Sequence, residues 1–397
     1  MRAVPLLMAL FFMVPHFAAA PDINQQRAKE LFLRLARIDS GKENEALICS
    51  LVERLLRDLG AEWVLNDEVS KKIGGTGGNI FAFFKGTAPA PPLLLSAHLD
   101  TVLSTENIQI VERDEIIATD GTTILGADDK AGVALILEVL QTIKEKSLPC
   151  PPLEVLFTIR EEKGLLGAKV FDLSQIKARY GLVVDGGGTP GELIIASPTH
   201  RGFEVTFYGK SAHAGAEPER GINAIAMAAF AIAQVPWGRL DEETTANVGI
   251  ISGGAAMNIV PDRCTVIGEV RSHQEEKVQQ VLNRLRDACT ASVAQFGGKM
   301  DWKEQVLFHG YRLTEEEPIV ATAVAAVQEL GLKPRLTKMG GGTDANVFAK
   351  GGIRCLVLPT GGRDHHSTKE HLILPEFYLN GRILLTIVMH WARGEKS

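Results

Sequence analysis

Short continuous apolar runs, separated by segments with a helical period, limit the folds that this sequence can adopt more than any other feature does. The runs are PLLLSA (92–97), LEVLFTI (153–159), GLVV (181–184) and CLVLP (355–359). Strands that are buried on both faces have this pattern, and they alternate with helices in parallel sheets. The intervening segment AGVALILEVLQTIKEK (131–146) repeats apolar residues at helical spacing. The sequence therefore predicts an α/β fold whose sheet is mostly parallel and flanked by helices.

The pattern changes between residues 200 and 311. The predicted elements there are strands at 203–207, 246–251, 264–271 and 302–308 and helices at 222–235 and 274–296. Their order, β-α-β-β-α-β, is that of a ferredoxin-like sandwich. Because the buried-strand pattern resumes at residue 355, we expect an inserted ferredoxin-like α+β domain at 200–311. The larger domain then consists of residues 22–199 and 312–397.

The N-terminal segment has a different character. Residues 1–21 contain one arginine, an apolar stretch and three consecutive alanines, which is the layout of a secretory signal. Proline directly after a cleavage site, as at Pro21, disfavours cleavage. A translation start that was assigned too far upstream therefore explains this segment as well as an export signal does. The five cysteines lack CxxC spacing and give no sign of an oxidising compartment. We expect a cytoplasmic protein, with export as the alternative if residues 1–20 act as a signal.

Charge and hydropathy exclude two classes of partner. The formal net charge is -6 and the sequence has no long basic run, which argues against nucleic acid as the main partner. After the N-terminal segment the sequence contains no apolar stretch of about eighteen residues, so we expect no stable membrane span.

Each buried run is followed by side chains of the kinds that bind metals. His98 and Asp100 follow the first run, Glu161 and Glu162 the second, Asp185 the third, and His365 and His366 the fourth. Parallel strands present ligands outside their carboxyl ends, so these residues should gather at one edge of the sheet. Asp128 of GADDKAG, at the head of a predicted helix, adds a further acid. Solvated loop acids explain any single member as well as a metal site does, but they explain the whole set poorly.

Several motifs together resemble a known family. They are SAHLDTV, GADDKAG, REEKGLLGAK, VVDGGG, SAHAG, NIVPD, GGGTDAN and HSTKE, and the resemblance covers residues 22–397. The family is that of the co-catalytic zinc exopeptidases, which include peptidase T, aminoacylase and glutamate carboxypeptidase. The form GADDKAG is most similar to the peptidase T branch. The resemblance implies a zinc exopeptidase-like catalytic domain and an inserted lid that pairs edge to edge in a homodimer.

The resemblance also assigns metal ligands. It implies that two Zn²⁺ ions are bound by His98, Asp128, Glu162, Asp185 and His366. Asp128 would bridge the ions, which relieves its repulsion with Asp129, and Asp129 would lie at a helix N-terminus, where negative charge is stabilised. Asp100 would orient His98 through the other imidazole nitrogen. Ligation by nitrogen and oxygen suits zinc, with Co²⁺ or Mn²⁺ as substitutes.

Two residues have implied catalytic roles. Glu161, beside the ligand Glu162, would be the general base that takes a proton from the bridging water. The alternative is that Glu161 is an exposed residue that pairs with Arg160. His213 of SAHAG would stabilise the tetrahedral oxyanion or a substrate carboxylate. Because it lies in the insertion and the metals lie in the larger domain, we expect His213 to act across the subunit boundary.

Three residues have implied roles in substrate binding. Asn258 and Arg271 resemble the family's clamp for a substrate carboxylate, a role that suits a planar bidentate donor. Glu269 stands where the family more often has aspartate, so the geometry of the clamp departs from the family pattern. Asn346, in the glycine-rich segment 340–346, is a further candidate, and a plain glycine-rich turn is the alternative.

The resemblance implies a dizinc exopeptidase that hydrolyses short peptides in the manner of a tripeptide aminopeptidase. An N-acyl-amino-acid amidohydrolase or a glutamate-type carboxypeptidase is the alternative, because these enzymes share the same metal ligands. An inactive peptide-binding protein is less consistent with a complete ligand set. The expected substrate is therefore a short peptide or an N-acyl amino acid.

Overall fold

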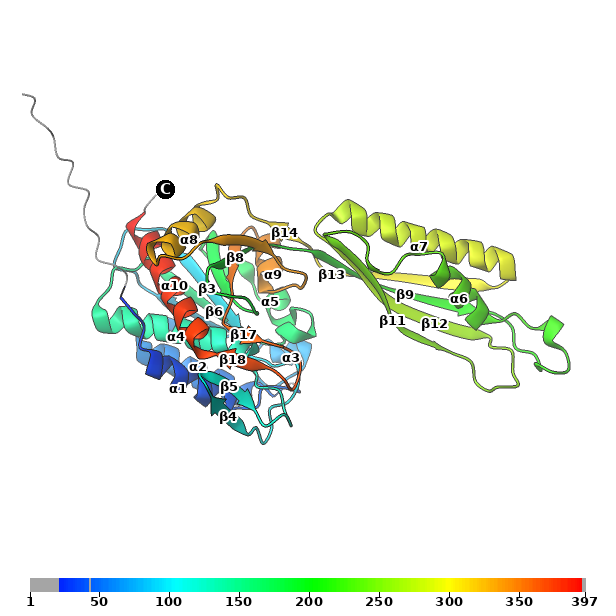
Figure 1. Cartoon of the computed structure of the whole chain (residues 1–397), viewed down its shortest axis with the longest axis horizontal. Coiled ribbons are helices and arrows are strands. Elements are labelled where there is room, and N and C mark those ends of the chain that lie inside the picture. Colours follow the sequence, from blue (N-terminus) through cyan, green and yellow to red (C-terminus); the bar gives the residue numbers. More distant parts are fainter. Residues whose placement is uncertain (1–20, 43, 395–397) are drawn as a thin grey trace, which may run out of the picture.

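The computed structural model describes residues 21–42 and 44–394, so the predicted signal at residues 1–20 lies outside the described part. Figure 1 shows a compact domain and a second, elongated domain that projects from it. Within the described residues, the compact domain contains a nine-stranded sheet in the order β1-β2-β6-β3-β7-β16-β8-β14, with β15 beside β8. None of the described helices combines the length and the hydropathy that a membrane span requires.

The centre of this sheet is parallel and corresponds to the predicted buried runs. Its strands are β6 (Leu153–Thr158), β3 (Leu93–His98), β7 (Tyr180–Val184) and β16 (Arg354–Leu358). They lie side by side in that order and pair in parallel. The predicted fold class is confirmed, since helices flank this sheet on both faces (Figure 1). The margins are formed by β1 (Trp63–Asn66), β2 (Ile80–Phe84), β8 (Glu192–Ser197), β14 (Tyr311–Arg312) and β15 (Arg335–Lys338).

Helix α4 (Ala127–Lys146) is the central helix of the compact domain. It packs on β3 and β7 and is covered in turn by other helices, so most of its residues are buried. The remaining helices are α1 (Gln25–Ala36), α2 (Ala46–Leu59), α3 (Ser70–Ile73), α5 (Leu166–Val170), α8 (Pro318–Glu329), α9 (Asp344–Lys350) and α10 (Leu374–Arg393).

Gly132 allows α4 to approach the sheet. A Cβ atom at this position would lie 2.0 Å from the carbonyl oxygen of Val184 and 2.5 Å from Oδ1 of Asp129. We expect Gly132→Ala to lower the free energy of unfolding by about 1–3 kcal/mol, because the helix must move off the strand. Urea denaturation measures this change. Gly341→Ala is the matched control, since a Cβ there meets nothing within 4 Å; equal stability of the two variants would contradict the close approach.

A small second sheet holds the segment that contains His365 and His366. Its order is β17-β18-β5-β4. The strands are β4 (Ile110–Arg113), β5 (Ile116–Thr119), β17 (Gly362–Arg363) and β18 (His371–Ile373). The two histidines lie in the turn between β17 and β18, so this sheet fixes the turn over the C-terminal end of the central strands.

The projecting domain is a sheet covered on one face by helices. In chain order its elements are β9 (Thr199–Tyr208), α6 (Ala224–Ala233), β10 (Gly238–Arg239), β11 (Thr244–Gly253), β12 (Arg263–Ser272), α7 (Glu275–Phe296) and β13 (Lys299–Phe308). The strand order is β10-β11-β12-β9-β13. Without the short β10, this is the ferredoxin-like arrangement that the order of the elements predicts.

Polar contacts cross the junction between the domains. The carboxylate of Glu243 in the projecting domain accepts hydrogen bonds from Lys338 and, at 3.1 Å, from Arg312 in the compact domain. Nη1 of Arg271 donates to the carbonyl oxygen of Gly340 at 3.3 Å. These contacts link the base of the insertion to Arg312, to Lys338 and to the start of the glycine-rich segment 340–346.

Candidate metal centre

His98 ends β3 and is 3% exposed. Its Nε2 lies 3.1 Å from Oδ1 of Asp128. Its Nδ1 lies 3.0 Å from the backbone carbonyl of Asp100 and 3.5 Å from Oδ1 of the same residue. Burial opposes protonation, but the carboxylates of Asp100 and Asp128 outweigh it and raise the pKa of His98. Asp100 thus contacts the imidazole nitrogen opposite to the one that faces Asp128.

The two adjacent aspartates of GADDKAG have different surroundings. Asp128 and Asp129 depart from helical dihedral angles at the start of α4. Oδ1 of Asp129 accepts a hydrogen bond from the backbone N–H of Gly132 and Oδ2 accepts one from His98, both at 3.2 Å. Asp129 therefore caps the regular part of the helix and ties it to β3. The carboxylate of Asp128 is left to face the site.

Histidines surround the Asp128 carboxylate. Besides His98, Nδ1 of His365 lies 3.1 Å and Nε2 of His366 lies 3.3 Å from its Oδ2. Burial alone would raise the pKa of Asp128, but these imidazoles hold it well below its usual range. Hydrogen bonds to Asp128 and Glu162 raise the pKa of His366 to about 10.

Glu161 and Glu162 begin the short turn that follows β6. Their backbone N–H groups donate to the two carboxylate oxygens of Asp100, at 2.9 and 3.1 Å. Oε1 of Glu162 lies 3.0 Å from Nε2 of His366. Glu161 is 9% exposed, and burial together with Asp185 raises its pKa. Asp100 therefore fixes the direction of both glutamates.

Asp185 follows β7 and is 6% exposed. Its backbone N–H donates to the carbonyl oxygen of Leu358 at 2.9 Å, which joins the ends of β7 and β16. Burial and the nearby charge of Asp128 raise the pKa of Asp185 to about 7.

The donor atoms suit a divalent cation. Ligand atoms of His98, Asp128 and Glu162 lie within 4.8 Å of one another, and so do those of His98, Asp129 and Asp185. Asp129 belongs to the second group by distance, although both of its oxygens already accept backbone hydrogen bonds. Buried carboxylates that raise one another's pKa form a site that a cation would stabilise.

His213 and Asn258 lie together at the far end of the projecting domain. The N–H of Ala214 donates to the carbonyl oxygen of Asn258 at 2.9 Å. Nδ1 of His213 accepts hydrogen bonds from Gly215 and Ala216 at 3.1 Å, so the proton of the neutral imidazole is on Nε2. Strand β9 has ten residues and separates this end from the compact domain by on the order of 30 Å.

Arg271 lies at the other end of β12, next to the domain junction. Its Nε and Nη2 donate to the two carboxylate oxygens of Glu269 at 3.0 and 3.1 Å. Nε2 of His200 lies 2.7 Å from Oε2 of Glu269. Asn258 precedes β12 and Arg271 is near its end, so one chain does not bring the two predicted clamp residues together.

Asn346 is 2% exposed. Its Nδ2 donates to the carbonyl oxygen of His309 at 2.7 Å, and its Oδ1 accepts hydrogen bonds from Ser197 and Thr343. The amide of Asn346 therefore fixes the start of α9 against the base of the insertion.

Two buried acids lie beside the site although the sequence analysis assigned no role to either of them. Asp344 is 2% exposed, and its Oδ2 accepts a hydrogen bond from Thr158 at 2.5 Å; burial raises its pKa to about 6. Glu370 is 1% exposed and accepts hydrogen bonds from the backbone of Asp128 and of the segment before it. Both lie in motifs that the sequence shows, GGGTDAN and HSTKE, but their partners are distant in the chain.

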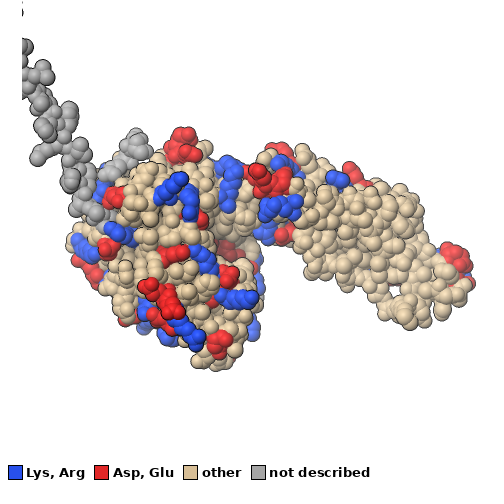
Figure 2. All heavy atoms as spheres, viewed as in Figure 1, with Lys and Arg blue, Asp and Glu red and all other residues tan. Residues whose placement is uncertain are grey.

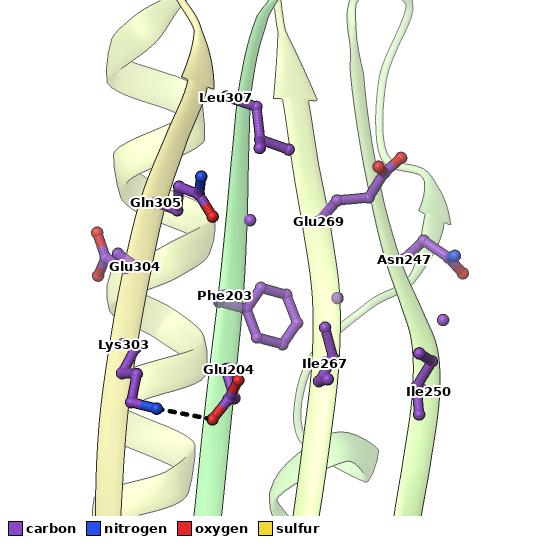
Figure 3. Close-up of a pocket in the computed structure, with 13 residues that line it drawn as sticks. Phe203, Glu204, Asn247, Ile250, Ile267, Glu269, Lys303, Glu304, Gln305 and Leu307 are labelled. Atoms are coloured by element: carbon purple, nitrogen blue, oxygen red, sulfur yellow. Dashed lines mark hydrogen bonds and ion pairs between the residues drawn. The ribbon is translucent and has the colours of Figure 1, made fainter. Parts of the chain in front are cut away.

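A hollow of about 670 Å³ lies on the open face of the projecting sheet, where Gly202, Gly249 and Gly268 lie on neighbouring strands. Figure 3 shows Phe203 and Ile267 among the residues that line it. An ion pair between Lys303 and Glu204, with a separation of 3.0 Å, lies at its side. The predicted metal ligands do not line this hollow.

Comparison with known proteins defines the class first. Residues 195–296 match the peptidase dimerisation domain, and residues 79–224 match peptidase family M28. The chain is therefore a peptidase with an inserted dimerisation domain.

Individual relatives define the family. The chain is 37% identical to aminopeptidase PepT of Bacillus cereus, with a TM-score of 0.88 over 93% of this chain and 99% of that one. A tripeptidase of Staphylococcus aureus is 34% identical, with a TM-score of 0.91 over 94% of this chain and 100% of that one. Peptidase T of Escherichia fergusonii is 30% identical over 68% of this chain and 67% of its own length. The chain belongs to the peptidase T family of metallopeptidases, which confirms the family resemblance.

A more distant structure shares the fold. It is a dinuclear metal-binding M20 peptidase of Bacillus subtilis, 16% identical, with a TM-score of 0.70 over 92% of this chain and 97% of that one.

Proposed function

We propose that the protein is a dizinc aminopeptidase that hydrolyses short peptides, with tripeptides as the substrate class. The observation that carries this proposal is the end-to-end likeness to an aminopeptidase and a tripeptidase. The gathering of His98, Asp128 and Glu162 around one point supports it. His98, Asp128, Glu162, Asp185 and His366 are the proposed ligands.

Bound zinc ions would polarise the scissile carbonyl and activate a water molecule. Glu161 is the proposed general base. It is buried beside the ligand Glu162, and its raised pKa suits a group that first accepts the proton of the attacking water and then delivers it to the leaving amine. Asp100 holds Glu161 in place through the backbone hydrogen bond described above. His98 is oriented by the same residue.

The substrate contacts are proposed to come from both subunits of a homodimer. His213 presents Nε2–H as a donor, which is what a developing oxyanion requires. The length of β9 keeps this donor away from the metal centre of its own chain. A second subunit that places His213 and Asn258 opposite Arg271 would complete both the oxyanion site and the carboxylate clamp.

The projecting domain has a surface suited to such pairing. Helix α6, with the sequence AIAMAAFAIA, contains no charged residue, and it exposes Ile225. Within the described residues, β10 pairs only with Thr245 and Ala246 on the outer edge of β11, so the rest of this edge is open. Figure 2 shows few charged side chains on this face of the projecting domain. A twofold pairing of β11 edges and α6 helices would bury these groups.

Product analysis tests the substrate class. Free, N-blocked and C-amidated tripeptides should be compared, and release of the N-terminal residue from free tripeptides alone is the expected result. Preference for N-blocked substrates would instead establish the amidohydrolase or carboxypeptidase alternative.

Metal removal tests the chemistry. Because Asp128 is proposed to bridge two cations, the purified protein should bind about two zinc equivalents, and a chelator should abolish hydrolysis. Atomic absorption and an activity assay before and after readdition of zinc measure both results. Full activity without bound metal would contradict the proposed function.

A further inference from the structure

The buried carboxylate of Glu370 links two segments that are far apart in the sequence. Its Oε2 accepts hydrogen bonds from the backbone N–H groups of Leu125, at 2.9 Å, and Gly126, at 2.7 Å. Its Oε1 accepts one from the N–H of Asp128 at 3.0 Å. These donors precede the regular part of α4, where backbone N–H groups have no partner within the helix. Glu370 therefore caps the start of α4, although it is 242 to 245 residues away in the sequence.

The same glutamate closes the turn that carries His366. Its own N–H donates to the carbonyl oxygen of Ser367 at 3.0 Å, and β18 begins at the next residue. His366 has a positive φ of 61° within this turn, and its Nε2 lies 3.3 Å from Oδ2 of Asp128. The separation of Asp128 and His366 thus depends on one residue, whose side chain binds the segment of Asp128 and whose backbone N–H closes the turn of His366.

We propose that Glu370 is a positioning residue of the metal centre, which holds Asp128 and His366 at the separation that a shared cation requires. This inference rests on the proposed function, because these two residues are the proposed ligands. Glu370 touches neither the substrate nor the reacting atoms, so it acts through the backbone of Asp128 and the turn of His366.

Glu370→Asp is the informative variant, because it keeps the charge and withdraws the carboxylate by about one carbon–carbon bond, roughly 1.5 Å. Metal-free protein should be titrated with Co²⁺, followed by absorption spectroscopy, and with Zn²⁺ against a chelating dye. We expect the affinity for one of the two cations to fall about 10- to 100-fold and the Co²⁺ spectrum to change. Glu370→Gln, measured in the same way, provides a second variant that keeps the length of the side chain.

Glu154→Asp is the matched control. Glu154 is 2% exposed, and its carboxylate also accepts backbone hydrogen bonds, from Lys177 at 3.0 Å and Ala178 at 2.8 Å, but at the opposite end of β6. Both aspartate variants should unfold at lower temperature, whereas metal affinity should change only in the Glu370 variants. Wild-type affinity for both cations in the Glu370 variants would overturn the inference. A wild-type protein that does not bind two cations would instead contradict the proposed function.

Discussion

Glu161→Gln is expected to lower turnover by about a hundred- to ten-thousand-fold while zinc binding is retained, because the amide cannot accept a proton from the attacking water. The side chain keeps its length and remains beside Glu162. Steady-state kinetics on a tripeptide and metal analysis of the same preparation measure the two quantities.

Glu162→Gln is the comparison that separates a base from a ligand. It changes the neighbouring glutamate, whose Oε1 faces His366 at 3.0 Å, and it should lose zinc as well as activity. If Glu161→Gln instead lost zinc with a modest loss of rate, Glu161 would be a metal ligand and the base would have to be sought elsewhere.

Two chains that are each nearly inactive are expected to restore activity when combined. His213→Ala removes the proposed oxyanion donor, which typically costs a hundred- to a thousand-fold in turnover, and Glu161→Gln removes the base. In a mixed dimer, the compact domain of the His213→Ala chain retains Glu161 and receives His213 from its partner. One site of two is then complete, so up to about half of the sites in mixed dimers should be active.

Co-refolding of the separately purified variants provides the measurement, and size-exclusion chromatography of differently tagged chains verifies the exchange of subunits. Glu161→Gln combined with Glu162→Gln is the matched control, because both changes lie in the compact domain and no mixed site is complete. Exchange without recovery in the first pair would mean that His213 serves its own chain or has a structural role.

Features that depend on residues close together in the sequence were predicted best. His98, Glu161, Glu162 and Asp185 follow buried strands directly, and parallel pairing of β6, β3 and β7 brings them to one edge of the sheet. The fold class and the family followed from the same runs and motifs, and both are confirmed. The roles of the individual site residues are predictions, and the experiments above test those of Glu161, Glu162 and His213.

Contacts between distant segments were beyond prediction from the sequence. The bonds of Glu370 cross 242 to 245 positions of the chain, and no local pattern indicates which backbone groups a buried acid will bind. Asn346 shows the same limit, since its motif predicts a glycine-rich turn near substrate but does not predict that Ser197 and His309 occupy its amide. The strands beside His366 were missed because runs as short as Gly362–Arg363 have no measurable period.

If His213 acts in trans as proposed, the length of the projecting sheet would make catalysis depend on the concentration of the protein. An isolated subunit would then contain every proposed metal ligand and yet lack the proposed oxyanion donor. Binding of zinc would then be a property of the monomer, whereas turnover would be a property of the dimer. The catalytically active fraction of the protein would then depend on its concentration in the cell as well as on an intact site.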